Sequence, residues 1–283
     1  MPVRGANSGT DEWHGQRVLV TGASSGIGRA TALAFATAGA TVGICARRAD
    51  RLTEVLAECN ACTPGARMWA VDLADLDGIG GFADAVCADL GGVDVLVNNA
   101  GAVGTDHLRR VTPLLERQRA EAADGAVTTP LDALVRLSDD EWRRMLAIHL
   151  DGTFYCTRAA VRAMAPRRRG VIVNMSSICG LAGCTGHPHY SAAKAAILGF
   201  TKAAAKELIV QGIRVNAVAP GHVGTETLEG EISAERRAIA ASTPAGRLAD
   251  PDEIAGTVAF LASDDAGYFV GAVLSPNGGL VTA

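Results

Sequence analysis

Three side chains in the second half of the sequence have the types and the spacing of a proton-transfer site. Tyr190 and Lys194 lie four residues apart in the segment YSAAK, so on a helix both would point to one side. A lysine ammonium beside a phenol lowers the phenol pKa from about 10 towards working pH, which makes the tyrosine usable as an acid or a base. Ser177 ends the apolar run GVIVNMSS and can hydrogen-bond the oxygen of a reacting carbonyl. Together the three residues predict acid–base chemistry at a carbon–oxygen bond.

A glycine-rich octet near the beginning of the chain has the spacing of a phosphate-binding turn. The first strand-like run ends in TGASSGIG (21–28), whose three glycines open directly into a helix-like run. Glycine lets the backbone turn sharply and approach a pyrophosphate, whose charge then lies at a helix N-terminus. The alternative is a tight turn with a purely structural role, which the strand before it and the helix after it disfavour.

The end of the second strand bears on the choice of cofactor. A site for NAD places an acidic residue there to hold the ribose 2′-hydroxyl, but this strand ends in Ala46, Arg47 and Arg48, and the first carboxylate is Asp50. An arginine at this point can pair with a 2′-phosphate through charge-assisted hydrogen bonds. The sequence therefore favours NADP(H) over NAD(H), with Arg47 as the first candidate and Arg48 as the second.

The elements that must position these residues alternate between strand-like and helix-like runs. The seven strand candidates are residues 17–22, 41–46, 67–73, 93–101, 170–177, 213–221 and 272–279. They are apolar throughout instead of alternating, as strands buried on both faces are. Helix-length sequence separates the earlier ones, as in 27–39, which ends at Gly39, and 48–59. The pattern predicts an α/β protein with a doubly wound parallel sheet of about seven strands.

One domain is predicted, since no linker or repeat divides the chain. We expect residues 1–14 to form a loose polar leader and 15–283 to form the domain. Some forty residues between Gly101 and Glu141 are too many for a plain connection, which indicates an inserted segment at about 103–137.

The composition excludes several classes of partner. With a net charge of −4 and a charged fraction of 20%, the chain has no basic footprint for nucleic acid, and its longest uncharged run is too short to span a membrane. The only basic run, 167–169, is expected to be a solvated helix end. The seven scattered cysteines, including a lone CxxC at 59–62, suit a reducing cytosol better than a disulfide framework.

With these motifs in this order, the chain resembles the classical short-chain dehydrogenase/reductase family from Arg17 to Gly279. The matching motifs are TGxxxGxG at 21–28, NNAG at 98–101, Ser177, YSAAK at 190–194 and VAPGHVGT at 218–225. The resemblance implies a Rossmann fold. It also implies that Tyr190 exchanges the proton of the substrate oxygen, that Lys194 lowers the tyrosine pKa and holds the nicotinamide ribose, and that Ser177 stabilises the substrate oxygen.

The resemblance also assigns residues to the cofactor. Asp72 matches the residue that contacts adenine, Asn98 supports the central strand, Val223 approaches the carboxamide through its backbone and Thr225 helps to hold the cofactor. The full set of implied contacts is Gly22, Ser24, Ser25, Gly26, Ile27, Gly28, Arg47, Arg48, Asp72, Leu73, Asn99, Ala100, Gly101, Tyr190, Lys194, Pro220, Gly221, Val223 and Thr225.

The chain departs from the family at one catalytic position. The family has an asparagine about twenty-eight residues before the serine, and here that position holds His149, flanked by the matching segment LDGTFYCTRA. In the family the carbonyl of this asparagine holds a water that links the lysine to solvent. His149 preserves this proton relay through its carbonyl and ring, or is a packed residue, or weakens the relay. No ligand cluster accompanies it, so no metal site is expected.

The resemblance implies an NADP(H)-dependent oxidoreductase that interconverts a ketone and a secondary alcohol, with a 3-oxoacyl thioester or a steroid-like compound as substrate. Such a protein is expected in the cytoplasm as a homotetramer or homodimer. The inserted segment is interpreted as a partial lid or an oligomer contact, and His187 and His189 either contact substrate or are loop residues. The alternative function is a non-catalytic dinucleotide-binding protein that acts as a redox sensor or scaffold.

Overall fold

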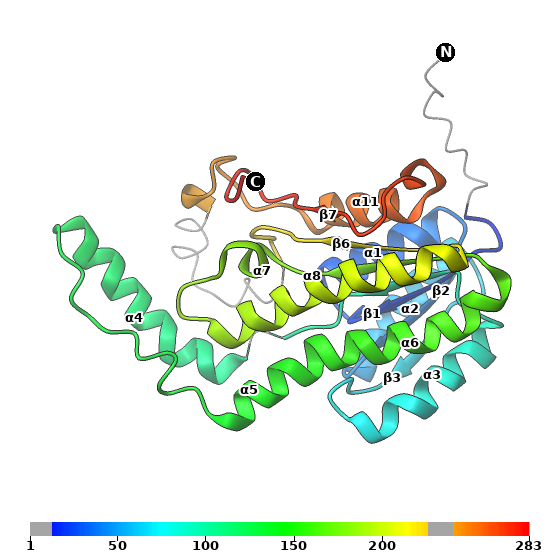
Figure 1. Ribbon diagram of the computed structural model, residues 1–283, viewed down its shortest axis with the longest axis horizontal. Helices are drawn as coiled ribbons and strands as arrows, with labels where there is room; N and C mark the ends of the chain where they lie inside the picture. The colour runs from blue at the N-terminus through cyan, green and yellow to red at the C-terminus, as the bar shows by residue number, and fades with distance from the viewer. Residues whose placement is uncertain (1–12, 103, 226–239, 283) are drawn as a thin grey trace, which may run out of the picture.

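A single parallel sheet of seven strands forms the centre of the protein (Figure 1). The computed structural model describes residues 13–102, 104–225 and 240–282. The strands run in the spatial order β3-β2-β1-β4-β5-β6-β7, and each pairs with its neighbours in parallel. They are β1 (Arg17–Thr21), β2 (Thr41–Ala46), β3 (Arg67–Ala70), β4 (Val95–Asn98), β5 (Gly170–Met175), β6 (Ile213–Val218) and β7 (Val273–Leu274). The predicted α/β class and the strand count are confirmed.

Alternate residues of the central strands enter two separate hydrophobic cores. Val18 and Val20 of β1 pack on one side of the sheet, whereas Leu19 between them packs on the other. The first core contains α1 (Gly26–Thr37), α2 (Ala49–Cys62) and α11 (Pro251–Ala262), and the second contains α3 (Leu76–Leu90), α6 (Gly152–Met164) and α8 (Pro188–Leu208). Helices therefore cover both faces, which is why the strands are apolar throughout.

The strand order reverses between β1 and β4, and this reversal determines where a ligand can bind. The chain goes from β1 outward to β2 and β3, then returns to β4 on the other side of β1. Crossover connections diverge at such a point, so a crevice opens beyond the carboxyl ends of the two strands. The glycine-rich octet follows β1 and NNAG follows β4, so both motifs lie at this crevice.

The long segment after β4 is a helix and a returning loop. Helix α4 (Thr105–Ala123) projects from one end of the molecule in Figure 1, and a loop leads from it to α5 (Asp139–Leu146). Glu121 accepts hydrogen bonds from the backbone N–H groups of Thr128 and Thr129, both at 2.8 Å, and so holds the loop against α4. Helix α5 starts in a capping box between Ser138 and Glu141.

A π-helical turn joins α5 to α6 at Ala147–Asp151. Such turns are rare and occur mostly at functional sites. His149 lies at the centre of this turn. Within the described residues, no helix combines the length and the apolar character that crossing a membrane requires.

Candidate active site

The glycine-rich octet forms a cradle that side chains would fill. A Cβ atom on Gly22 would lie 2.6 Å from Cα of Ala100, and one on Gly28 would lie 2.3 Å from the Gly22 carbonyl oxygen. Gly26 has a φ of +53°, which glycine adopts without a steric penalty. Ser25 precedes α1 without capping it through its side chain, so the first N–H groups of the helix have no side-chain cap. Free N–H groups at a helix N-terminus next to a bare backbone suit a phosphate.

The loop after β4 is fixed to the loop after β1. The Thr21 hydroxyl accepts hydrogen bonds from the backbone N–H groups of Asn99 at 3.0 Å and Ala100 at 2.9 Å. The Asn99 side chain donates in return to the carbonyl oxygens of Thr21 and Gly22. These bonds hold the two motifs together at the point where the strand order reverses.

Behind this loop, amide side chains connect the central strands. The Asn98 amide donates to the side chain of Asn174 at 2.8 Å and to the Thr157 hydroxyl at 3.0 Å, and all three residues are buried. Buried polar groups are stable only when they are hydrogen-bonded, so this network ties β4 to β5 and α6. It agrees with the supporting position expected of Asn98.

The two arginines after β2 differ in their surroundings. Arg48 donates to the hydroxyls of Ser24 at 3.2 Å and Ser25 at 3.0 Å, so its guanidinium lies beside the glycine cradle. The charge of Arg47 instead acts on Asp72. The second sequence candidate, Arg48, is therefore hydrogen-bonded to the phosphate-binding turn, and the first candidate, Arg47, acts on Asp72.

Asp72 has a partner that the sequence did not indicate. Burial raises the pKa of this carboxyl, but hydrogen bonds from the Ala74 N–H and from Arg144 outweigh it and lower the pKa below its ordinary value. Nη2 of Arg144 on α5 lies 3.1 Å from the carboxylate. The ion pair joins the end of β3 to α5, and no periodic pattern reveals a contact of this sequence separation.

Ser177 is positioned by the short helix that it begins. It is the N-cap of α7 (Ile178–Ala182), and its Oγ accepts a hydrogen bond from the Cys179 N–H at 3.1 Å. Serine is strongly preferred at this position because its oxygen satisfies a free N–H of the first turn. The cap fixes the hydroxyl at the end of β5, next to Tyr190.

Tyr190 and Lys194 lie on one face of α8, as their spacing predicts. The Nζ atom of Lys194 is 5.7 Å from the centroid of the tyrosine ring and donates to the Met175 carbonyl at 2.7 Å. Burial lowers the pKa of Lys194 to about 7. Burial also raises the pKa of Tyr190, and the Ser177 hydroxyl lowers it to a smaller extent. The structure thus differs from the expectation of a lowered tyrosine pKa, because burial has the larger effect in this arrangement.

His149 is a buried, neutral side chain in contact with the tyrosine. Its ring lies edge-on to the Tyr190 ring with centroids 5.4 Å apart, and Nε2 is 2.8 Å from the Ala102 carbonyl oxygen. Burial, together with the nearby Lys194, lowers the pKa of His149 to about 3. The His149 carbonyl accepts a hydrogen bond from the Thr153 hydroxyl at 2.7 Å. The ring also explains Gly101, since a Cβ there would lie 2.5 Å from Cε1 of His149.

Two cavities meet at the tyrosine. One, of about 220 Å³, is lined by Gly22, Ser25, Gly26, Ile27, Gly28, Asn99, Gly101, Ala102, His149, Met175, Ser176, Tyr190, Lys194, Pro220 and Thr225. The other, of about 790 Å³, shares Tyr190 and Thr225 with the first and adds Ser177, Gly221 and Val223. Eleven of the nineteen predicted cofactor residues thus line the first cavity, whereas Ser177 and Tyr190 both line the second.

Part of the wall of the larger cavity comes from α4. Most lining residues of this helix follow each other at intervals of three or four, which places them on one face, and Gln118 lies next to Arg119 on the same side: Leu108, Thr112, Leu115, Gln118, Arg119 and Ala122. A lid or an oligomer contact was expected of this segment, but the face of α4 that lines the cavity was not predicted. The spacing of the lining residues could have indicated that face.

The two histidines before Tyr190 have different positions. His187 lines the larger cavity, whereas His189 is buried against His107 of α4 with ring centroids 4.4 Å apart. His107 also lies 2.6 Å from the Gly186 carbonyl oxygen through Nε2. The pair therefore attaches α4 to the loop that leads into α8.

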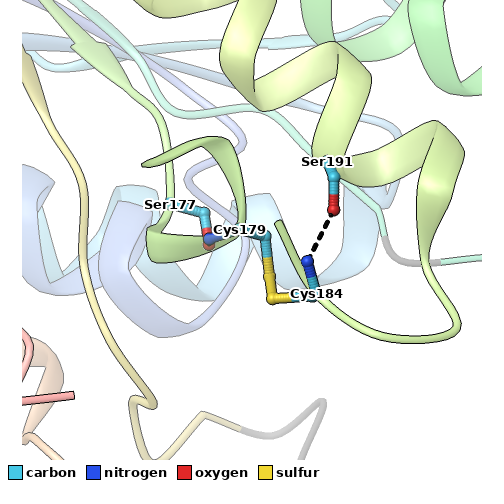
Figure 2. Close-up of a disulfide and its surroundings, with 4 residues drawn as sticks. All are labelled: Ser177, Cys179, Cys184 and Ser191. Atoms are coloured by element: carbon cyan, nitrogen blue, oxygen red, sulfur yellow. Dashed lines mark hydrogen bonds between the residues drawn. A yellow bond between two sulfur atoms is a disulfide. The ribbon is translucent and has the colours of Figure 1, made fainter. Parts of the chain in front are cut away.

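A disulfide lies in the same wall (Figure 2). Cys179 and Cys184 are bonded to each other and both line the larger cavity. The expectation of unpaired cysteines is wrong for these two, because the turn after α7 brings their Cα atoms within 4.9 Å. The Cys184 N–H donates to the Ser191 hydroxyl at 3.0 Å, so the bridge links the Ser177 turn to α8. Cys45, Cys59, Cys62 and Cys156 are free, as expected.

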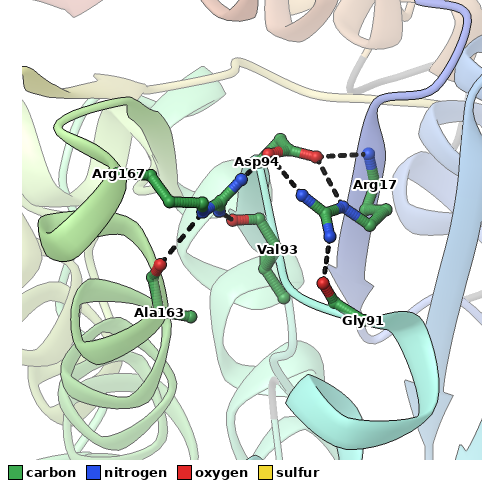
Figure 3. A network of polar contacts seen from close by, with 6 residues as sticks. All are labelled: Arg17, Gly91, Val93, Asp94, Ala163 and Arg167. Atoms are coloured by element: carbon green, nitrogen blue, oxygen red, sulfur yellow. Dashed lines mark hydrogen bonds and ion pairs between the residues drawn. The ribbon is translucent and has the colours of Figure 1, made fainter.

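Arg167, the first residue of the basic run, lies near the amino ends of the central strands β1 and β4 (Figure 3). Asp94 accepts hydrogen bonds from the backbone N–H of Arg17 at 2.9 Å and from its guanidinium at 2.8 Å, and it also pairs with Arg167. The prediction of a purely solvated helix end is wrong for Arg167, because its guanidinium reaches the buried carboxylate of Asp94. The network joins the beginnings of β1 and β4 to the end of α6.

Leu73 and the described residues of the polar leader do not contribute observed contacts to the site. Leu73 is buried in the core beside Gly152 and offers no polar side chain. The expected polar leader, 1–14, lies mostly outside the described residues. Among the residues that the structure describes, no group of three or more histidine, cysteine or acidic side chains is arranged to hold a metal ion.

Comparisons with known proteins agree with this geometry. The family model described as short chain dehydrogenase matches residues 16–236. The chain is 36% identical over 267 residues to the 3-oxoacyl-(acyl-carrier-protein) reductase FabG of Thermotoga maritima, covering 94% of this chain and 98% of the relative. It is 39% identical over 264 residues to the cis-4-hydroxycyclohexanecarboxylate dehydrogenase of Sinomonas cyclohexanicum, covering 92% and 94%. A crystal structure from Sinorhizobium meliloti 1021, described as a short-chain alcohol dehydrogenase, superposes with a TM-score of 0.80 at 32% identity, covering 96% and 98%.

Proposed function

The chain belongs to the short-chain dehydrogenase/reductase family and is an oxidoreductase that acts on CH–OH groups and ketones, and from this premise we propose an NADP(H)-dependent ketone reductase with Tyr190 as its acid. The observation that carries the proposal is the junction of the two cavities. The glycine cradle lines one cavity, the Ser177 hydroxyl lines the other, and the Tyr190 side chain borders both.

The lining of the smaller cavity supports a dinucleotide as ligand. The backbone approach at Gly22 and Gly28 and the uncapped N-terminus of α1 leave room and N–H groups for a pyrophosphate. Arg48 beside Ser24 and Ser25 supports a 2′-phosphate and hence NADP(H), while Arg47 remains the second cation at this strand end. NAD(H) is the alternative. When bound, the nicotinamide supplies or accepts the hydride.

The residues of the chain itself supply position and protons. During reduction the Tyr190 hydroxyl donates its proton to the substrate oxygen, and in the reverse direction it takes that proton back. The Ser177 hydroxyl donates a hydrogen bond to the same oxygen and stabilises the charge that develops on it. Lys194, buried beside the tyrosine ring, favours the ionised phenolate whenever it carries its proton.

A 3-oxoacyl thioester is the substrate that we propose for the larger cavity. The similarity to the FabG reductase over nearly the whole of both chains supports this class. The cavity extends from Tyr190 along α4 and is mostly apolar, which suits an acyl chain.

The proposal is tested by mixing the purified protein with acetoacetyl-coenzyme A and either NADPH or NADH, and following the oxidation of the nicotinamide. We expect turnover with NADPH and a lower kcat/KM with NADH. The absence of turnover with any of a panel of ketones and secondary alcohols, while the cofactor binds normally, would contradict the enzymatic function and favour a dinucleotide-binding scaffold.

We propose that the segment at about 103–137 narrows substrate choice, because one face of α4 lines the larger cavity. Deletion of residues 105–130 is expected to broaden the range of ketones that are reduced. An unchanged substrate preference and an unchanged assembly state in the deletion variant would contradict this role.

A homotetramer or homodimer is also proposed. Large apolar side chains are exposed on α6, on α11 and before β7, namely Phe154, Phe260, Tyr268 and Val270. Light scattering is expected to give a multiple of the 29.0 kDa chain mass, and a monomer would contradict the proposal. We propose a cytoplasmic location because four of the six described cysteines are free, and in that compartment the Cys179–Cys184 bridge would be reduced; fractionation of cells that express the protein tests the location.

A further inference from the structure

The four arginines of α4 differ in one respect. Arg109 pairs with Asp106 at 3.3 Å, Arg110 pairs with Glu141, and Arg117 pairs with Glu121 at 3.2 Å. Arg119 has no acidic partner among the residues that the structure describes. An arginine guanidinium presents five N–H donors in a fixed plane, so an unpaired one is available to an anion from outside the protein.

Arg119 also faces the substrate cavity. It shares the lining face of α4 with Leu108, Leu115 and Ala122. Among the described lining residues it is the only charged side chain, and none is acidic. At 1.5 Å per residue, Arg119 is about 16 Å along the helix from Leu108. A bound substrate therefore meets a single positive charge along this wall, and none of the described residues that line the cavity carries a carboxylate to neutralise it.

A second polar group of the same cavity lies near this charge. His222 follows Gly221 after β6 and lines the same cavity. Burial, and to a smaller extent the charge of Arg119, lower the pKa of His222 below its ordinary value. The His222 ring is therefore neutral and lies within range of the electrostatic effect of the guanidinium. Its Nδ1 atom is buried and has no hydrogen-bond partner within the described part of the chain. A buried ring nitrogen without a partner costs free energy unless a ligand satisfies it.

We propose that Arg119, assisted by His222, binds an anionic group of the substrate that is separate from the reacting carbonyl. The inference rests on the proposed ketone reductase function and adds the charge of the substrate to it. The anion is either the carboxylate of an oxo acid or the phosphate of a phosphopantetheine arm that carries the acyl thioester. Both present oxygen atoms that a guanidinium binds through two parallel hydrogen bonds.

The test uses two matched pairs of compounds, and the members of each pair differ in one anionic group. The first pair is 6-oxoheptanoate and its methyl ester, and the second is acetoacetyl-phosphopantetheine and acetoacetyl-pantetheine. Binding of each compound is measured by calorimetry with the protein loaded with NADP⁺, so that no reduction takes place. Turnover with NADPH is measured separately for the same compounds.

We expect the wild type to bind the charged member of at least one pair about tenfold or more tightly than the neutral member. Arg119→Gln is expected to abolish this preference, raising KM for the charged member with little change in kcat, and His222→Phe to reduce it. Arg109→Gln is the matched control, because it removes a charge from the same helix outside the cavity. Discrimination within only the first pair identifies a carboxylate, and within only the second a phosphate.

Two results would overturn the inference: equal binding of both members of both pairs by the wild type, or a preference that survives in Arg119→Gln. In either case continued reduction of the neutral compounds would still support the proposed reductase function. If binding depends on charge but no compound is reduced, the result supports the anion site and contradicts the proposed reductase function.

Discussion

The imidazole of His149 lies edge-on to the phenol of Tyr190, with ring centroids 5.4 Å apart. Because burial holds the pKa of His149 at about 3, the ring is neutral when the enzyme works and adds no charge beside the phenol. Its Nε2 atom is hydrogen-bonded to the backbone of Ala102, which fixes the ring against the cofactor loop. The position is thus a packed one that still touches the proposed acid.

Replacement of Tyr190 by phenylalanine tests the proposed acid. Without the hydroxyl, kcat should fall by a factor of about 10² to 10⁴, the usual range for one acid–base group. The ring itself remains, so the affinity for NADPH should stay nearly unchanged in a fluorescence titration. Turnover close to that of the wild type would mean that another group donates the proton.

His149→Asn tests the departure at the catalytic position. The substitution keeps the backbone carbonyl, which accepts from the Thr153 hydroxyl, and restores an amide side chain. We expect kcat for ketone reduction to be retained or raised. A variant that is folded and binds NADPH but has lost most of its activity would show that the imidazole ring has a role of its own.

The same variant should resist acid better than the wild type. Between pH 6.5 and about 3 the unfolded chain protonates His149 whereas the folded chain does not, so the free energy of unfolding falls as the pH falls through this window. The loss from this group is on the order of 5 kcal/mol across the window. His149→Asn should therefore shift the acid unfolding midpoint, followed by circular dichroism, to lower pH. An equal shift in the exposed control His14→Asn would exclude this cause.

Local sequence patterns were sufficient to predict where most strands lie and that the catalytic side chains share one face of a helix. The apolar run TVGICA is strand β2 over its predicted length, and Tyr190 and Lys194 share one face of α8. Predicted strands that end in loops are shorter in the structure, because the residues after Asn98 leave the sheet to line the cofactor cavity. Strand β7 has only two residues, and after it Asn277 forms a turn in which its side-chain oxygen accepts a hydrogen bond from the Gly279 N–H.

Contacts between distant segments were not predictable from such patterns. The ion pair of Asp72 with Arg144 joins residues 72 positions apart, and the pairing of Cys179 with Cys184 depends on the turn between them. The spacing of residues along α4 indicates that one face of the helix is directed inward, but only the fold shows which cavity this face lines. The preference for Arg48 over Arg47 likewise depends on where each side chain points after a shared strand end.

Arg48→Ala should change the choice of cofactor. A charge-assisted hydrogen bond to a phosphate contributes about 1.5–3 kcal/mol, which corresponds to an increase in KM for NADPH of roughly tenfold to a hundredfold. KM for NADH should change little, since NADH has no 2′-phosphate. Arg47→Ala is the matched comparison, and a larger effect on NADPH in that variant would reverse the assignment of the two arginines.

Removal of the Cys179–Cys184 bridge should lower stability without a change of fold. The bridge closes a loop across five residues, and the chain-entropy relation gives about 2 kcal/mol for a loop of this size. The double variant Cys179→Ser and Cys184→Ser should therefore unfold at lower urea concentration than the oxidised wild type. A reductant should lower the wild-type midpoint towards that of the variant and leave the variant unchanged. Because the Cys179 N–H donates to the Ser177 hydroxyl, loss of the bridge should also raise KM for ketones. An unaltered urea midpoint would show that hydrogen bonds alone hold the turn.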